Sequence, residues 1–485
     1  MDIVSTFRRA ACRHSDRLFL FDGKTAVTYA EAQARANAIA AELRARGGEP
    51  GSRVGLAASD RVSLWLAILA TWMNGALPGL IDARTPADSL PYFLDDIDAS
   101  LILAAPEITE RLCAAGAANV VDLDEMGRDG AQTAADCHGP ASPLYLSYTS
   151  GTTGAPKGAV LLSEPVTLAT RCIADRLQLS CNDILLACTP ISSSFQLVAA
   201  LMPAVEVGAA VGLAAGSSVD DIWNLARQYR TTVLVAYPLT LSDVVNAPQA
   251  AESDIPFRVA LSGGSSLAPR IKRDFRERMG VPLLESYGQS ELGGFMAMGA
   301  PLDPVAVLDA GFAGRSLPDR LTFIGDMDCR ELPAGEVGEV MVTHGYFDHY
   351  RNKPEKTAEA QRGGVLHTGD LGVANEDGYV KMLGRVSEAG AARERGGFLR
   401  EVEDCYYEHD DVQHAAVVAG QSGRVEGFVE LRQGKQASVQ ELQEYVSSRV
   451  APGLVPARTT ILEKMPRTFS GKADRLSLAR RVDAG

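Results

Sequence analysis

A dense polar segment offers the clearest chemistry in the chain: residues 146–161 read LSYTSGTTGAPKGAVL. Hydroxyl side chains and glycines surround Lys157 there, directly after an apolar, strand-like run. Hydroxyls, unhindered backbone N–H groups and one ammonium are what a loop needs to wrap a polyphosphate. The segment differs from a Walker A motif, which requires Gly-Lys-Ser/Thr, because Lys157 follows Pro156. An ordinary surface turn rarely places so many donors beside a lysine. The candidate phosphate-binding residues are Thr149, Ser150, Gly151, Thr152, Thr153, Gly154 and Lys157.

Four further segments follow this loop in order. Residues 286–294 read SYGQSELGG, residues 367–370 read HTGD, Gly384 and Arg385 are adjacent, and residues 466–475 read PRTFSGKADR. In order and approximate spacing, the five segments resemble the motifs of the adenylate-forming superfamily, and among its members the acyl- and aryl-CoA ligases (acyl-CoA synthetases). Peptide-synthetase adenylation domains and firefly-type luciferases belong to the same superfamily. The resemblance covers nearly the whole chain.

The resemblance implies a nucleotide site for ATP and AMP. Tyr287 would stack its ring on adenine, a task for an aromatic side chain. Asp370 would accept hydrogen bonds from both ribose hydroxyls, and Arg385 would donate from the other side. Further nucleotide-binding positions implied by the resemblance are Gly264, Ser265, Ser266, Gly288 and Ser290, the last in place of the family's usual Thr.

The resemblance also implies the catalytic residues Lys472, Thr149 and Glu291. Glu291 and Thr149 would hold Mg²⁺, whose hard charge prefers carboxylate oxygen and phosphate. Lys472 would approach the substrate carboxylate and the α-phosphate, and stabilise charge as the carboxylate attacks and pyrophosphate leaves. The implied reaction has two halves: an acid and MgATP give an acyl-adenylate and pyrophosphate, and then the thiol of coenzyme A gives a thioester and AMP.

The acid is expected to lie against the segment that follows Pro190. Related peptide-synthetase domains usually carry Phe-Asp where this chain has Phe195 and Gln196. Without that carboxylate nothing would pair with an α-ammonium, so an α-amino acid is not expected. Small pocket residues leave volume for a bulky aryl, polycyclic or medium-to-long acyl acid, unless the glycines instead serve close approach to ATP. The expected substrate-binding residues are Ser194, Phe195, Gln196, Tyr237, Gly263, Gly293 and Gly294.

A hinge is implied just after the Gly384-Arg385 pair, because the family performs its two half-reactions in two orientations of the C-terminal domain. The expected division is an acyl-adenylate and ATP-binding core at 1–384, a hinge at 385–388 and a mobile domain at 389–485. The hinge residues would be Arg385, Val386 and Ser387.

The hinge loop departs from the family, which usually has an acidic residue and then a Lys there. This chain has Ser387, and Arg393 and Arg395 follow. Arg395 would occupy space near the nucleotide or the thiol's path. One hypothesis is therefore specialisation for adenylation only, or for thioesterification of a preformed acyl-adenylate supplied by a partner ligase; the alternative is neutral loop drift. An acyl carrier protein could replace coenzyme A as the thiol. A luciferase-like oxygenase and a non-catalytic nucleotide-binding paralogue are the remaining alternatives.

The elements that must position these residues follow an α/β pattern. Helix-like residues 29–46 precede the strand-like run 53–57, and further strand-like runs at 101–104, 232–237 and 257–261 alternate with helical patterns. This alternation predicts parallel-type sheets with helices. Residues 335–379 predict a smaller β unit, which in the resembling family is a small β-barrel. Residues 386–397 predict a linker and loop, and the remainder predicts a small, mobile α+β domain.

Composition limits the partners. The chain has 485 residues, and its 61 acidic and 47 basic side chains give a formal charge of −14. Such an acidic surface repels nucleic-acid phosphates and anionic lipids, so neither is an expected partner. Eight cysteines without a CxxC pair predict reduced thiols in a cytoplasmic protein. The apolar stretches at 64–73 and 195–216 predict core helix and strand rather than a membrane span.

Overall fold

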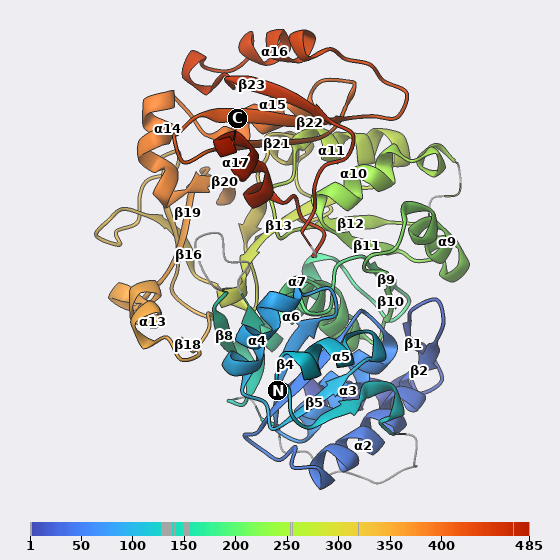
Figure 1. The fold of residues 1–485 in the computed structure, drawn as a ribbon. Coiled ribbons are helices and arrows are strands. Elements are labelled where there is room, and N and C mark those ends of the chain that lie inside the picture. Colours follow the sequence, from blue (N-terminus) through green and yellow to red (C-terminus); the bar gives the residue numbers. More distant parts are fainter. Residues whose placement is uncertain are drawn as a thin grey trace.

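The computed structural model describes residues 2–127, 138–139, 141–148, 156–252, 254, 256–318, 320–468 and 470–484. Two large sheets with helices form the N-terminal part, and a small three-stranded sheet with its own helices forms the C-terminal part (Figure 1). This arrangement confirms the predicted α/β class with a small α+β domain at the C-terminus.

The first sheet has the strand order β16-β17-β19-β20-β15-β14-β13-β12-β11-β9-β10-β1-β2 within the described residues. Neighbours from β1 through β10, β9, β11 and β12 to β13 are parallel, and those from β13 to β16 are antiparallel. The bounds are β1 Leu18–Phe21, β2 Ala26–Thr28, β9 Ile184–Ala187, β10 Ala210–Leu213, β11 Val233–Ala236, β12 Val259–Ser262, β13 Leu283–Gln289, β14 Gly294–Met298, β15 Gly314–Ser316, β16 Thr322–Gly325, β17 Gly338–Val342, β19 Leu366–Ala374 and β20 Tyr379–Arg385.

The second sheet has the order β18-β8-β7-β4-β3-β5-β6 within the described residues. Its bounds are β3 Arg53–Ala58, β4 Leu77–Asp82, β5 Leu101–Ala104, β6 Val120–Asp122, β7 Pro143–Tyr148, β8 Gly158–Leu162 and β18 His349–Tyr350. The third sheet, β21-β22-β23, belongs to the C-terminal domain and comprises β21 Val412–Ala419, β22 Val425–Leu431 and β23 Arg458–Leu462.

The helices of the N-terminal part connect and cover the two sheets. They are α1 Ile3–Arg13, α2 Tyr29–Ala45, α3 Val62–Met73, α4 Leu90–Ile97, α5 Pro106–Ala114, α6 Ser163–Arg176, α7 Ser194–Gln196, the π-helical η3 Leu197–Leu201, α8 Met202–Val207, α9 Val219–Tyr229, α10 Pro238–Asn246, α11 Pro269–Asp274, the π-helical η5 Phe275–Met279, α12 Val305–Asp309 and α13 Pro354–Ala360. Single turns of 3₁₀ helix are η1 Ala87–Ser89, η2 Leu123–Glu125, η4 Pro248–Ala251, η6 Ser290–Leu292, η7 Arg362–Gly364 and η8 Val386–Glu388. The C-terminal helices are α14 Ala389–Arg395, α15 Leu399–Tyr407, α16 Val439–Ser447, η9 Pro452–Leu454 and α17 Arg475–Ala484.

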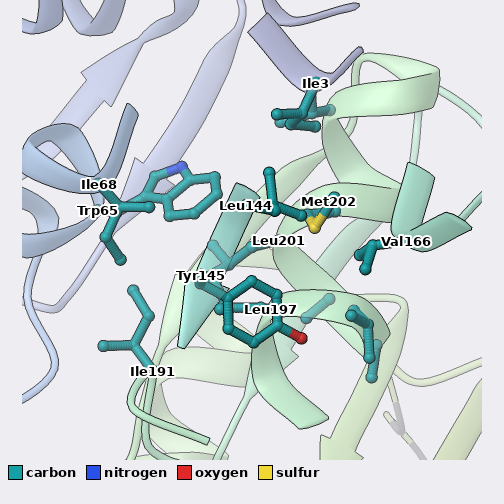
Figure 2. Close-up of a cluster of buried hydrophobic side chains, with 14 of the residues drawn as sticks. Ile3, Trp65, Ile68, Leu144, Tyr145, Val166, Ile191, Leu197, Leu201 and Met202 are labelled. Carbon is teal, nitrogen blue, oxygen red and sulfur yellow. The ribbon is translucent and has the colours of Figure 1, made fainter. Parts of the chain in front are cut away.

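The main core lies between the two large sheets, where α3 is buried on nearly every side. Its sequence VSLWLAILATWM is apolar all round, as a helix enclosed by other elements requires. Figure 2 shows Trp65 and Ile68 of α3 facing Leu144 of β7 and Leu201 of η3. The two apolar stretches noted in the sequence therefore form core elements, as predicted. Within the described residues, no helix combines the length and apolarity needed to cross a bilayer.

Two predictions from the sequence need correction. The β unit at 335–379 does not stand apart, because β17, β19 and β20 continue the first sheet through hydrogen-bonded ladders. Residues 386–397 are largely helical rather than a loop, since η8 leads directly into α14. The alanines, arginines and glutamates of this stretch are acceptable helix formers, and Gly396 ends α14 with a φ of 81°.

Candidate active site

Several of the predicted site residues lie at the carboxyl ends of parallel strands in the first sheet. Segments that follow β9, β11 and β12 supply Phe195, Tyr237 and Gly264, respectively. The carboxyl edge of a parallel sheet is the usual place for a ligand site in α/β proteins. The topology therefore brings together residues that lie far apart in the sequence.

The residues predicted to bind the nucleotide form one hydrogen-bonded group around Asp370. The Tyr287 hydroxyl donates to Oδ2 of Asp370 at 2.5 Å, and Arg385 Nη1 lies 3.1 Å from Oδ1. Asp370 and Arg385 are partners in the β19–β20 ladder, which explains their proximity. Burial raises the pKa of the Asp370 carboxyl, against the opposing effect of Arg385. A hydroxyl donor and a cation thus hold this carboxylate in place.

Gln289 completes this group and was not identified from the sequence. Its Nε2 donates to Asp370 Oδ2 at 2.7 Å and to the Thr368 carbonyl at 2.8 Å. Ser290, the next residue, donates its hydroxyl to the Tyr148 carbonyl at 3.1 Å. Gln289 lies inside the SYGQSELGG segment, which the sequence analysis had singled out. A single glutamine in that segment does not by itself indicate a contact with Asp370.

A second group links the lysine of the polar loop to the predicted metal ligand. Tyr350 donates its hydroxyl to Glu291 Oε1 at 2.5 Å, and Lys157 Nζ donates to the same hydroxyl at 3.3 Å. Lys157 Nζ also lies 4.3 Å from the centre of the Tyr350 ring. Burial and the neighbouring Glu291 raise the pKa of Tyr350, which keeps its proton. The sequence analysis did not identify Tyr350.

The other residues predicted for the phosphate-binding loop lie outside the described residues. They are Thr149, Ser150, Gly151, Thr152, Thr153 and Gly154. Lys157 and the Gly158 at the start of β8 are described, and β8 pairs with β18, which carries Tyr350. The end of the loop is therefore fixed beside Glu291.

Lys472 reaches Tyr237 and Gly264 from the C-terminal domain. Its Nζ lies 5.1 Å from the centre of the Tyr237 ring, and its Cε is close to Gly264. In Figure 1 the loop before α17, drawn in red, extends from the C-terminal domain toward the N-terminal sheet. Loss of hydration lowers the pKa of Lys472 to about 8. A Cβ at Gly264 would lie 2.6 Å from the Tyr237 ring, so a glycine is needed where the two domains meet.

Contacts between α10 and the C-terminal domain hold this loop in place. Asp243 accepts from Arg467 Nη2 at 2.6 Å and lies 2.7 Å from His414 Nε2. These partners outweigh the effect of burial and lower the pKa of Asp243 to about 2. Leu239 packs in one apolar cluster with Phe428 and Met465. The interface is thus both apolar and charged, and it supports the insertion of Lys472.

Aromatic rings line the region expected to hold the acid. Phe195 stacks on Tyr237 with ring centres 5.6 Å apart and lies 5.5 Å from Phe295. The Tyr237 hydroxyl is 2.8 Å from the hydroxyl of Ser193, which is the neighbour of the predicted Ser194. Ser265 and Ser266 are exposed on the loop after β12. Phe195 and Tyr237 therefore lie together as the sequence analysis expected.

The glycines do not supply the open volume that the sequence analysis inferred. A Cβ at Gly263 would lie 2.4 Å from the Phe195 ring, and one at Gly293 would lie 2.7 Å from Val166. At Gly294 it would lie 3.3 Å from Ala169, and at Gly288 it would lie 2.2 Å from the Gly294 carbonyl. These positions are small because other parts of the chain pack against them. The argument for a bulky acid from small walls is therefore wrong.

A carboxylate does lie next to Gln196, contrary to the expectation that none is near. Gln196 Nε2 donates to Asp60 Oδ2 at 3.0 Å, and the Ile191 N–H donates to Oδ1 at 2.6 Å. Burial raises the pKa of Asp60 to about 7, even though both hydrogen bonds act to lower it. The Gln196 side chain is fully buried, and its Oε1 has no partner among the described residues. Asp60 comes from the loop after β3, so no local pattern near Gln196 indicated it.

The segment predicted to be the hinge is exposed, and Arg395 contacts the C-terminal domain rather than the group around Asp370. Val386 and Ser387 are exposed in η8, and the Arg385 N–H donates to Glu388 at 3.3 Å. Arg395 Nη2 donates to the Gly423 carbonyl at 3.1 Å, in the turn between β21 and β22. In this domain orientation Arg395 is therefore part of the C-terminal surface.

Family models and known relatives match most of the chain. Residues 7–346 match the family model of the AMP-binding enzymes, and residues 401–472 match that of the AMP-binding enzyme C-terminal domain. The chain is 28% identical to a fatty acid–[acyl-carrier-protein] ligase of Streptomyces coeruleorubidus, over 95% of this chain and 92% of that protein. It is 27% identical to a feruloyl-CoA synthase of an Amycolatopsis species, over 93% of each.

Two other similarities complete the comparison. The chain is 27% identical to one of the linear gramicidin synthase proteins of Brevibacillus parabrevis over 98% of its own length, but spans only 6% of that protein. The crystal structure of a benzoate CoA ligase from Burkholderia xenovorans shares the fold with a TM-score of 0.89 and 23% identity, covering 99% of this chain and 100% of that one. Because the first family model covers most of the sequence, the chain belongs to the family of AMP-binding enzymes.

Proposed function

We propose that this enzyme joins a carboxylic acid to the thiol of coenzyme A through an acyl-adenylate, with release of pyrophosphate and then AMP. The observation that carries the proposal is the position of Lys472, which the C-terminal domain inserts beside Tyr237 and Gly264. One ammonium shared between an incoming carboxylate and a phosphate is what this displacement needs. The similarity to a feruloyl-CoA synthase supports a CoA thioester as product.

The groups on the first sheet would bind ATP. Asp370 and Arg385 would bind the ribose, and their mutual ion pair of 3.1 Å keeps both in position before the nucleotide arrives. Tyr287 would face adenine. Lys157, at the end of the polar loop, would neutralise phosphate charge beside Tyr350. Together, Lys157, Arg385 and Lys472 would supply positive charge for polyanionic ligands in a chain whose formal charge is −14.

The residues around Glu291 fit a magnesium ion. Glu291 offers a buried carboxylate, and Tyr350 orients it through a hydrogen bond of 2.5 Å. Mg²⁺ commonly takes one or two carboxylates and completes its octahedron with phosphate oxygens and water. When bound, the ion would neutralise charge on the phosphates of ATP. Lys472, a residue of the chain itself, would stabilise the charge that is shared between the incoming carboxylate and the phosphate.

For the acid we propose an aryl carboxylic acid. The Phe195, Tyr237 and Phe295 rings support a flat ring by stacking and edge contacts. Gln196 replaces the acidic residue of amino-acid-activating relatives, and Asp60 already accepts hydrogen bonds from Gln196 and Ile191. Its raised pKa makes Asp60 a poor permanent counter-ion for an α-ammonium near neutral pH.

Acid-dependent exchange of labelled pyrophosphate into ATP tests the proposal. A panel would contain benzoate, cinnamate, phenylalanine, octanoate and acetate, each assayed with Mg²⁺. We expect the aryl acids to support exchange and phenylalanine to fail. Exchange that is fastest with phenylalanine or acetate would overturn the choice of acid, whereas no exchange with any acid would contradict adenylation itself. Replacing coenzyme A by a carrier-protein thiol in the second half-reaction then identifies the acceptor, and conversion of synthetic acyl-adenylate tests whether both halves are retained.

A further inference from the structure

A thiol, an imidazole and a carboxylate lie in line at the edge of the first sheet, outside the groups assigned above. Cys329 Sγ is 3.6 Å from His367 Nε2, and His367 Nδ1 is 2.8 Å from Glu339 Oε2. A nucleophile beside a base, with the base oriented by a third group, is the arrangement that activates a nucleophilic side chain. The proposed ligase reaction uses none of these three side chains.

The fold fixes each member of this group, which we name the thiol triad (Cys329, His367 and Glu339). Glu339 lies on β17 and His367 on β19, which are adjacent antiparallel strands. Cys329 lies in the turn after β16, and its φ of 60° is unusual for a residue with a side chain. The Asp326 side chain accepts from the Arg330 N–H at 2.9 Å across that turn. The turn therefore holds the sulfur beside Nε2 of the imidazole.

Cys329 is more exposed than the other two residues of the thiol triad, and a thiol must be accessible to react. The His367 side chain is 3% exposed and that of Glu339 is 12% exposed, whereas Cys329 is partly exposed. Gly363 approaches Cys329, and a Cβ there would lie 3.4 Å from the sulfur. Reagents can thus reach the sulfur while the base and its orienting carboxylate stay shielded from water.

We propose that Cys329 is a modification site that reacts with small disulfides and soft electrophiles. As Sγ attacks one sulfur of a disulfide, His367 Nε2 takes the thiol proton. A new S–S bond forms to Cys329, the original S–S bond breaks, and the leaving thiolate takes the proton from His367. The reaction consumes one thiol and one disulfide and forms one of each, so it needs no added oxidant or reductant. Glu339 holds the imidazole with Nε2 toward the sulfur and is a positioning residue.

A structural role alone would predict a different outcome. Glu339 Oε1 also accepts from the Gly369 N–H at 2.9 Å, so the His367–Glu339 pair could serve only to hold the strand before Asp370. In that case the thiol would react no faster than its exposure allows. Cys12 and Cys113 are exposed and provide internal comparisons within the same chain.

The test is site-resolved labelling of the full chain with iodoacetamide and, separately, with glutathione disulfide, followed by peptide mass spectrometry. We expect Cys329 to react about tenfold faster or more than Cys12 and Cys113. His367→Gln should remove that advantage without changing the labelling of Cys12, and continued protection of the buried Cys188 reports that the variant is folded. Cys329→Ser should lose the rapid adduct and keep pyrophosphate exchange, so failure of the ligase proposal would leave this test intact. Equal rates in the wild-type chain overturn the proposal, and so does an unchanged Cys329 rate in folded His367→Gln. If that variant does not fold, the wild-type comparison decides.

Discussion

Replacing Lys472 should separate the two half-reactions. Lys472→Ala removes the ammonium that lies 5.1 Å from the Tyr237 ring, next to Gly264, and no other described lysine has this position. We expect adenylation to slow while conversion of a preformed acyl-adenylate with coenzyme A continues, because the attack of the thiol does not need this charge. Exposed Lys464, on the same domain, provides the matched control as Lys464→Ala.

The size of the effect follows from the environment of Lys472. Burial lowers its pKa from 10.5 to about 8, which corresponds to roughly 3 kcal/mol against the charged form in the free enzyme. Partial solvent contact screens the charge and reduces this figure to about 2 kcal/mol. The negative charge that develops in the transition state offsets the cost of keeping Lys472 charged. A poorly hydrated ammonium also stabilises that negative charge more strongly than a fully hydrated one. Loss of one such donor slows a reaction by about 10²–10³-fold.

The pH dependence gives the sharpest assay. Only the ammonium form is competent, so kcat/KM for adenylation should fall as pH rises above about 8, by tenfold per pH unit. Pyrophosphate exchange measured from about pH 6.5 to 10 should show this fall in the wild-type chain and in Lys464→Ala, and lack it in Lys472→Ala. If Lys472→Ala exchanges pyrophosphate at the wild-type rate, or shows the same fall with pH, the role of Lys472 is refuted.

Three further changes test the remaining groups. Tyr350→Phe removes the hydroxyl that joins Lys157 to Glu291; we expect the Mg²⁺ concentration for half-maximal exchange to rise about tenfold, and an unchanged Mg²⁺ titration would contradict this link. Asp370→Asn should raise the KM for ATP by about 10–100-fold and reduce discrimination against 2′-deoxy-ATP, and persistence of that discrimination would exclude Asp370 from the ribose site. Asp60→Asn should leave the melting temperature unchanged near pH 4, where the carboxyl with a pKa of about 7 is protonated, and raise stability at pH 8.5 by about 2 kcal/mol. Stability is lost in the wild type as pH rises from the unfolded pKa near 4 to about 7, so equal melting temperatures at pH 8.5 would show that Asp60 carries no buried charge.

Local patterns predicted much of the fold. The run LILA at 101–104 forms β5 as expected, and the helix expected at 29–46 forms as α2 at Tyr29–Ala45, with its start fixed by a capping box between Thr28 and Glu31. Such elements follow from side-chain periodicity and caps, which are properties of neighbouring residues. The helix α14 was missed because its alanines and arginines show no strong apolar period, and its contacts with η9 are made by residues distant in the sequence.

Candidate site residues could be predicted where a motif marked them, but not where a contact partner lay elsewhere in the chain. Asp370 and Arg385 were both predicted from motifs, and the β19–β20 ladder places them together. Gln289 and Tyr350 depend on tertiary contacts that no spacing encodes. The small residues were expected to leave volume for a bulky acid, and this inference failed for a physical reason. The space beside a glycine can hold a ligand or a neighbouring side chain, and at Gly263 the Phe195 ring occupies it.

In the proposed reaction, the acid's own carboxylate oxygen attacks the α-phosphate of ATP. This step is tested directly by incubating the enzyme with ATP, Mg²⁺, coenzyme A and an aryl acid labelled with ¹⁸O in its carboxyl group. Mass spectrometry of the products should find one ¹⁸O in AMP and a CoA thioester of the acid, because thiol attack breaks the bond between acyl carbon and the transferred oxygen. Unlabelled AMP, or ADP in place of AMP, would contradict an acyl-adenylate.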